Sequence, residues 1–121
     1  MATFSKQLLS GSTGGRLIKV AATATPGTTI HATGTSATII DEVWLYAINT
    51  SASDDLLTIE FGGTTADDDL IKFTVTAQSG LYLVIPGLVL TGDGSSARTI
   101  TAFAATTNVI NIGGYVNRIT P

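Results

Sequence analysis

The stretch that decides the fold is residues 39–63, IIDEVWLYAINTSASDDLLTIEFGG. In its first half, Val43 and Leu45 alternate with Trp44 and Tyr46, and the same alternation continues to residue 49. Successive side chains of a β-strand point to opposite faces. The pattern therefore predicts a long strand with two different faces.

A polar break over residues 49–55 separates this strand from a second alternating run. Leu57, Ile59 and Phe61 share one side of that run, and Thr58 and Glu60 share the other. Two alternating runs joined by a turn-rich loop are typical of strands that pair with each other. We therefore predict that residues 43–49 and 57–61 form a strand pair.

Shorter runs of strand-forming residues continue along the chain, separated by turn signals such as Pro26-Gly27. We expect them at residues 16–22, 28–33, 70–77, 81–85, 98–106 and 109–118. Pro86-Gly87 is expected to end the run that begins at residue 81. About eight short strands at regular spacing predict an all-β fold, an antiparallel β-sandwich of the jelly-roll or immunoglobulin-like kind.

The 121 residues are enough for one self-sufficient core. We expect a short N-terminal arm over residues 1–15, because this segment is brief and runs into glycine-rich sequence, and one β-sandwich domain over residues 16–121. The period-two pattern predicts a core made of residues that all lie on inward positions of the expected strands. These are Leu45, Ile59, Phe61, Phe73, Val75, Leu83 and Ile85.

The surface carries few charges. Charged residues make up 12% of the chain, against roughly a quarter in ordinary domains, and the formal net charge is −3. Such a surface suits burial against other subunits, because few ions lose their hydration there. We therefore expect a homo-oligomer, most simply a trimer.

Two classes of partner are not expected. The six Lys and Arg residues are spread over the whole chain, so they do not form the basic stripe that nucleic acid binding requires. The longest apolar run, residues 81–90, is interrupted by Pro86-Gly87 and is too short to span a membrane. We expect no nucleic acid and no membrane as partners.

No motif in the sequence indicates catalysis, a cofactor or a metal. The cluster Asp67-Asp68-Asp69 lacks the alternate spacing of oxygen ligands in calcium loops and is expected to be a solvated loop. His31 is the only histidine and there is no cysteine, so a zinc site has no ordinary ligand set and a plain surface or strand histidine is expected. Nucleophilic catalysis needs a nucleophile beside an oriented base, and no such motif is present. The predicted catalytic, cofactor and metal residues are therefore none.

Trp44 and Tyr46 allow two interpretations. Exposed aromatic rings suit stacking on sugar rings, which would make the chain a carbohydrate-binding module. The position of both residues in the most hydrophobic strand instead favours packing in the core or at a subunit interface. An accessible Trp44 would favour the first interpretation.

Several segments of the chain resemble a known group of proteins. They are DEVWLYAINTSAS (41–53), LTIEFGGTT (57–65), LIKFTV (70–75), QSGLYLVIPGLVL (78–90) and AFAATTNVINIGGYVNRI (102–119). Over roughly residues 28–119 the sequence resembles small virion proteins of tailed bacteriophages that are described as head decoration (cement) or minor structural proteins. The similar segments are expected to be core strands and turns. The resemblance therefore identifies no catalytic residue in this chain.

The resemblance implies a non-enzymatic, all-β subunit on the outside of a capsid, often trimeric, that clamps neighbouring copies of the major capsid protein. It implies a location on the virion capsid surface after assembly in the host cytoplasm. We expect partner contacts at Phe4, Leu8 and Leu9 in the arm and at Arg16 just after it. A tail or head–tail connector protein and a carbohydrate-binding β-sandwich module remain the alternatives.

Overall fold

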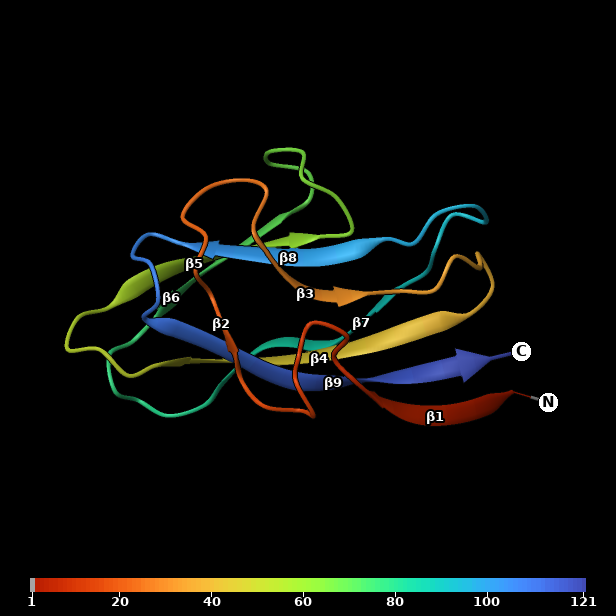
Figure 1. Ribbon diagram of the computed structural model, residues 1–121, viewed down its shortest axis with the longest axis horizontal. Coiled ribbons are helices and arrows are strands. Elements are labelled where there is room, and N and C mark those ends of the chain that lie inside the picture. The colour runs from red at the N-terminus through yellow and green to blue at the C-terminus, as the bar shows by residue number, and fades with distance from the viewer. Residues whose placement is uncertain (1) are drawn as a thin grey trace.

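A computed structural model describes residues 2–121, which form nine strands in two antiparallel sheets stacked as a sandwich (Figure 1). Sheet A has the order β1 (Thr3–Leu8), β9 (Ile110–Thr120), β4 (Ile40–Asn49) and β7 (Tyr82–Leu90), and the short β2 (Ile18–Lys19) also pairs with β9. Sheet B has the order β3 (Thr28–Ala32), β8 (Thr99–Ala104), β5 (Asp55–Phe61) and β6 (Leu70–Val75). The expected antiparallel β-sandwich is confirmed. No helix in this part of the chain is long and apolar enough to cross a membrane.

The core lies between the two sheets. In β4 the odd-numbered residues are buried and the even-numbered residues are only half-buried, as the alternation predicted. Aliphatic side chains from both sheets meet in the middle, among them Leu45 from sheet A and Ile59 from sheet B, each fully buried. Full burial of such a side chain contributes about 1.5–3 kcal/mol.

The predicted pairing of residues 43–49 with residues 57–61 is wrong. β4 pairs with β9 and β7, whereas β5 pairs with β6 and β8 in the other sheet. The loop between them therefore carries the chain from one sheet to the other. Each of the two strands has one apolar side, and these sides are buried when the strands face each other across the core.

The expected end of a strand at Pro86-Gly87 is also wrong, because β7 continues through both residues to Leu90. Proline is tolerated there because β7 is an edge strand, where a missing N–H leaves no ladder partner unpaired. The pairing of β7 with β4 contains two register shifts, one on each side of Trp44-Leu45. These shifts change which residues of β7 point inward.

Of the seven predicted core residues, four are fully buried, two are partly buried and one is exposed. Leu45, Ile59, Val75 and Ile85 are fully buried, and Phe61 and Phe73 are partly buried and packed against the core. Leu83 is 45% exposed and lies opposite Tyr46 on the outer side of sheet A.

The N-terminal segment is part of the sandwich. β1 pairs with β9 over six residues, from Thr3 opposite Thr120 to Leu8 opposite Tyr115, so the two ends of the chain lie side by side in Figure 1. Leu9 follows β1 and is 2% exposed, buried in the core. The prediction that Leu9 contacts a partner is therefore wrong, because this side chain already packs within its own chain. Met1, the first residue of the expected arm, lies outside the described residues.

Candidate binding surface

The side of sheet A that faces away from sheet B is apolar and aromatic. Residues directly opposite each other in an antiparallel pair point to the same side. The outward residues of β4 therefore identify their outward neighbours on β9, β1 and β7 through the register of the strands. We call this surface the outer face; its members are Phe4, Lys6, Leu8, Leu17, Lys19, Ile40, Glu42, Trp44, Tyr46, Ile48, Leu83, Pro86, Val89, Asn111, Tyr115, Asn117 and Ile119.

A row of packed side chains crosses the middle of the outer face. Trp44 stacks on Tyr115, with ring centroids 6.4 Å apart and 14° between the planes. The Nζ atom of Lys6 lies 4.7 Å from the centroid of the Tyr115 ring. On the β7 side, a Cβ added to Gly87 would lie 3.0 Å from Cζ2 of Trp44. The row therefore runs across four strands, from β1 to β7.

Two side chains contact the Tyr115 ring, which is half-buried. Trp44 and Lys6 come from β4 and β1, the two strands that flank β9 in sheet A, so they approach the ring from neighbouring strands on both sides. The benzo ring of Trp44 also lies close to Gly87 of β7, where an added Cβ would meet it. A sugar ring needs an open aromatic face for stacking. Trp44 and Tyr46 are both half-buried, so neither ring is fully open for such stacking.

Three polar side chains of the outer face are joined by hydrogen bonds. Glu42 Oε1 accepts a hydrogen bond from Trp44 Nε1 at 2.7 Å and another from Asn117 Nδ2 at 3.0 Å. These two bonds, that from Trp44 first, lower the pKa of the Glu42 carboxyl. Hydrogen bonds to the charged form of a carboxyl group favour that form. Glu42 thus stays charged while it fixes the orientation of the indole.

Large apolar side chains surround this row and reach solvent. Of the eight large hydrophobic residues that are exposed within residues 2–121, five lie on the outer face. The most exposed are Phe4 (69%), Leu8 (59%) and Val89 (57%), and the other two are Leu17 and Leu83. Exposed apolar residues gathered on one face mark binding sites more often than scattered ones do. The outer face is therefore the best candidate for a functional site.

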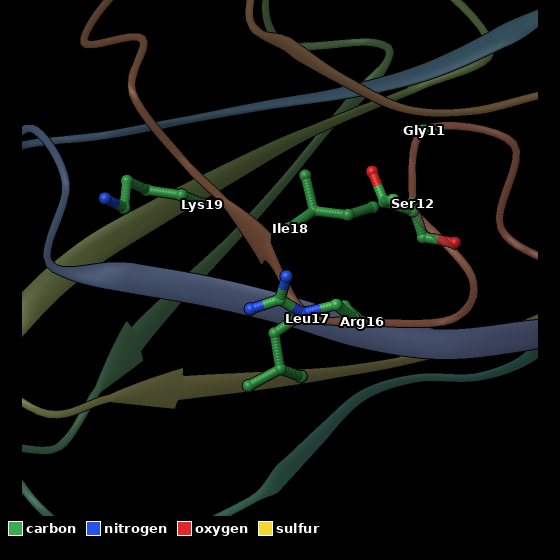
Figure 2. A pocket seen from close by; sticks show the side chains of 7 residues that line it. Gly11, Ser12, Arg16, Leu17, Ile18 and Lys19 are labelled. Carbon is green, nitrogen blue, oxygen red and sulfur yellow. The ribbon is translucent and has the colours of Figure 1, made fainter.

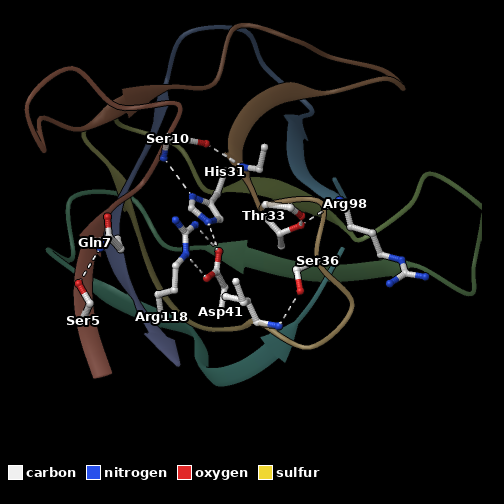
Figure 3. Close-up of polar contacts among 12 residues, drawn as sticks. Ser5, Gln7, Ser10, His31, Thr33, Ser36, Asp41, Arg98 and Arg118 are labelled. Atoms are coloured by element: carbon white, nitrogen blue, oxygen red, sulfur yellow. Dashed lines mark hydrogen bonds and ion pairs between the residues drawn. The ribbon is translucent and has the colours of Figure 1, made fainter. Parts of the chain in front are cut away.

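Behind the outer face, a buried polar cluster joins four parts of the chain (Figure 3). Asp41 of β4 accepts two hydrogen bonds from Arg118 of β9, from Nε at 2.8 Å and from Nη2 at 2.9 Å. The same carboxylate lies 2.8 Å from Nε2 of His31 of β3. The amide of Ser10, just after β1, donates to Nδ1 of His31 at 3.0 Å. The cluster therefore fastens the N-terminal segment to both sheets.

The hydrogen bonds define the state of each member of this cluster. Because Nδ1 of His31 accepts from a backbone amide, its Nε2 carries the hydrogen and donates to Asp41. Burial alone would raise the pKa of the Asp41 carboxyl, but hydrogen bonds from Arg118 and His31 outweigh it, and the pKa is lowered. The Ser10 hydroxyl accepts from the amide of Ala32 at 2.7 Å. The side-chain groups of Ser10, His31 and Asp41 are thus occupied in holding strands together.

A second buried carboxylate lies in sheet B. Glu60 is fully buried and accepts hydrogen bonds from the hydroxyl groups of Thr25 at 2.5 Å and Thr101 at 2.6 Å, and from the amide of Gly27 at 2.8 Å. Burial alone would raise the pKa of the Glu60 carboxyl. The hydrogen bonds from Thr101, Thr25 and the Gly27 amide together have the larger effect, so the pKa is lowered. This carboxylate ties the loop before β3 to sheet B.

The remaining sequence candidates lie apart from the outer face. Asp67 and Asp68 are exposed in a loop, and the Asp69 carboxylate accepts a hydrogen bond from the amide of Thr65 at 3.0 Å. Across residues 2–121, no three His, Asp or Glu side chains gather closely enough to hold a metal ion. Of the expected contact residues, Phe4 and Leu8 lie on the outer face, and Arg16 is exposed beside its rim.

The structure also adds residues to the candidate site that the sequence did not indicate, chiefly Leu83, Val89 and Tyr115. The exposed side of β7 was hidden by its two register shifts. In comparisons with known proteins, the sequence matches no model of a protein family and no curated protein.

Proposed function

We propose that this chain is a non-enzymatic structural subunit of a tailed-phage virion, which binds the outer surface of the capsid and holds neighbouring major capsid proteins together. The proposal rests on the resemblance over residues 28–119, and the all-β fold is consistent with what the resemblance implies. The supporting observation that carries most weight is the apolar outer face of sheet A.

The outer face suits contact with other copies of the same chain. Every copy carries the face, so association between copies removes the apolar surface from water without a second kind of partner. Obligate interfaces between copies are more apolar than transient ones. The trimer implied by the resemblance would place three copies of each capsid contact at fixed distances.

Multivalency explains how such an oligomer would act as a cement. A weak contact between one subunit and the capsid becomes strong when linked copies engage several capsid subunits at once. Binding to the assembled lattice and not to its free subunits stabilises the lattice by mass action. We assign the capsid contact to Phe4 and Leu8, because they are the most exposed apolar side chains on β1, at the edge of sheet A.

The test uses capsids assembled from the cognate major capsid protein without this chain. Added wild-type protein should cosediment with the capsids and raise the temperature at which they rupture. The double variant Phe4→Ser/Leu8→Ser should fold normally and lose most of the binding. Leu56→Ser is the matched control, since Leu56 is 41% exposed in β5 of sheet B.

Three results would contradict the proposal in different ways. Capsids that rupture at the same temperature with and without the protein would reject the cement role. Full binding by the Phe4→Ser/Leu8→Ser variant would reject these two residues as the contact. Binding to tails or connectors alone would place the same structural subunit elsewhere in the virion.

A further inference from the structure

A small hollow lies at the rim of the outer face, between the glycine-rich loop that follows Leu9 and strand β2. Its volume is about 320 Å³, and Figure 2 shows the residues that line it. They are Gly11, Ser12, Thr13, Arg16, Leu17, Ile18 and Lys19. Leu17 also belongs to the outer face, where it covers Gly113. The hollow and the apolar surface are therefore neighbours.

The hollow is lined by two cationic residues and by no anionic one. Arg16 and Lys19 are both exposed, and no Asp or Glu lines the hollow. Neither cation forms an ion pair with any of residues 2–121. Three of the other cations are engaged within the chain: Lys6 over Tyr115, Arg98 on the carbonyls of Thr91 and Gly92, and Arg118 on Asp41. In a chain of net charge −3, two unpaired cations in one small hollow are a distinct feature.

The hollow also has side-chain and backbone donors without a partner within residues 2–121. The Ser12 hydroxyl donates to the Leu9 carbonyl at 2.7 Å and accepts from the Gly15 amide at 3.3 Å, so it is already used. The hydroxyl and the amide of Thr13 make no hydrogen bond to any residue from 2 to 121. Arginine and lysine side chains only donate. The available groups are therefore mainly donors.

We propose that this hollow binds an oxyanion, the carboxylate or phosphate group of a ligand. An oxyanion supplies acceptors and negative charge, which is what the donors of Arg16, Lys19 and Thr13 lack within the chain. The guanidinium of Arg16 can bind two oxygens of such a group at once, and Lys19 adds a second charge. The inference does not depend on the proposed capsid role.

The experiment is a titration of the ¹⁵N-labelled protein with sodium phosphate, and separately with sodium acetate, at ionic strength held constant with sodium chloride. We expect amide shifts concentrated in residues 11–19, with a Kd on the order of millimolar. Shifts with acetate alone identify a carboxylate site, and shifts with phosphate alone identify a phosphate site. The absence of local shifts with either salt would overturn the proposal.

Removing the two positive charges tests whether Arg16 and Lys19 bind the oxyanion. Arg16→Gln/Lys19→Gln should weaken binding by at least about tenfold, because hydrogen bonds to charged groups are the stronger kind. Lys72→Gln is the matched control, since Lys72 is an exposed cation on β6 in the other sheet. Equal weakening by both variants would show a general charge effect and would overturn the assignment. Unchanged binding by the Arg16→Gln/Lys19→Gln variant would overturn it as well.

Discussion

Trp44 and Tyr115 are register partners on adjacent strands, and their rings stack with centroids 6.4 Å apart on the outer face of sheet A. Lys6 and Gly87 extend the contact to the strands on either side. The rings are thus held in one position before any partner binds. Side chains that are already ordered lose less conformational entropy on association, so the arrangement favours binding.

Gly87→Ala should disturb this row. Gly87 has φ +86, and an added Cβ would lie 3.0 Å from Cζ2 of Trp44. Backbone strain and overpacking together should lower the free energy of unfolding by about 2–4 kcal/mol. The emission of Trp44, the only tryptophan, should shift as the indole moves.

Gly80→Ala separates the two causes. Gly80 has a similar φ of +79, but nothing lies within 4 Å of an added Cβ. This variant should show the strain alone, with unchanged tryptophan emission. Equal losses of stability in the two variants, measured by urea unfolding, would contradict the contact between Gly87 and Trp44.

Asp41→Ala should release the N-terminal segment. Removal of the carboxylate leaves Arg118 and the buried His31 without their acceptor, and the loss of one partner of a buried ion pair costs ~3–5 kcal/mol. Arg118 is 31% exposed and regains some hydration in the variant. We therefore expect the free energy of unfolding to fall by about 2–4 kcal/mol. Amides of β1 should exchange with deuterium faster than those of β8. The exposed Asp68→Ala change should have little effect on either quantity.

The two buried carboxylates predict a loss of stability in acid. The pKa values of Glu60 and Asp41 are lowered in the fold from 4.5 and 3.8. A group with a lowered pKa stabilises the fold above its unfolded pKa, and this stabilisation disappears as the pH falls through the folded value. The free energy of unfolding should therefore be constant above about pH 5 and should fall steeply below about pH 4.5. In the Glu60→Gln variant, the free energy of unfolding should decline less steeply with falling pH than in the wild type. Equal slopes for the variant and the wild type would contradict the role of Glu60.

Local patterns in the sequence were sufficient to predict most strands and the orientation of β4. The alternation over residues 43–49 places Val43, Leu45 and Ala47 inside, and all three are fully buried. Alternation reports which side of a strand is apolar, but it does not report which strand lies alongside. That is why β4 and β5 were expected to pair and instead face each other across the core.

The candidate site was predictable only in part. Phe4 and Leu8 are recognisable as apolar residues in a short polar segment, but the order of strands that puts them beside Tyr115 is a tertiary property. The exposure of Leu83 depends on two register shifts that leave no local signal. The buried cluster joins residues 10, 31, 41 and 118, so no sequence spacing indicates it.

The central claim is that the outer face of sheet A drives assembly, and sedimentation equilibrium at micromolar concentration tests it most directly. The comparison uses Leu83→Asp on the outer face and Leu56→Asp on sheet B, because the two leucines are similarly exposed, at 45% and 41%. We predict a trimer for the wild-type protein and for Leu56→Asp, and a folded monomer for Leu83→Asp. A wild-type monomer, or a Leu83→Asp variant that associates as strongly as the wild type, would contradict the account.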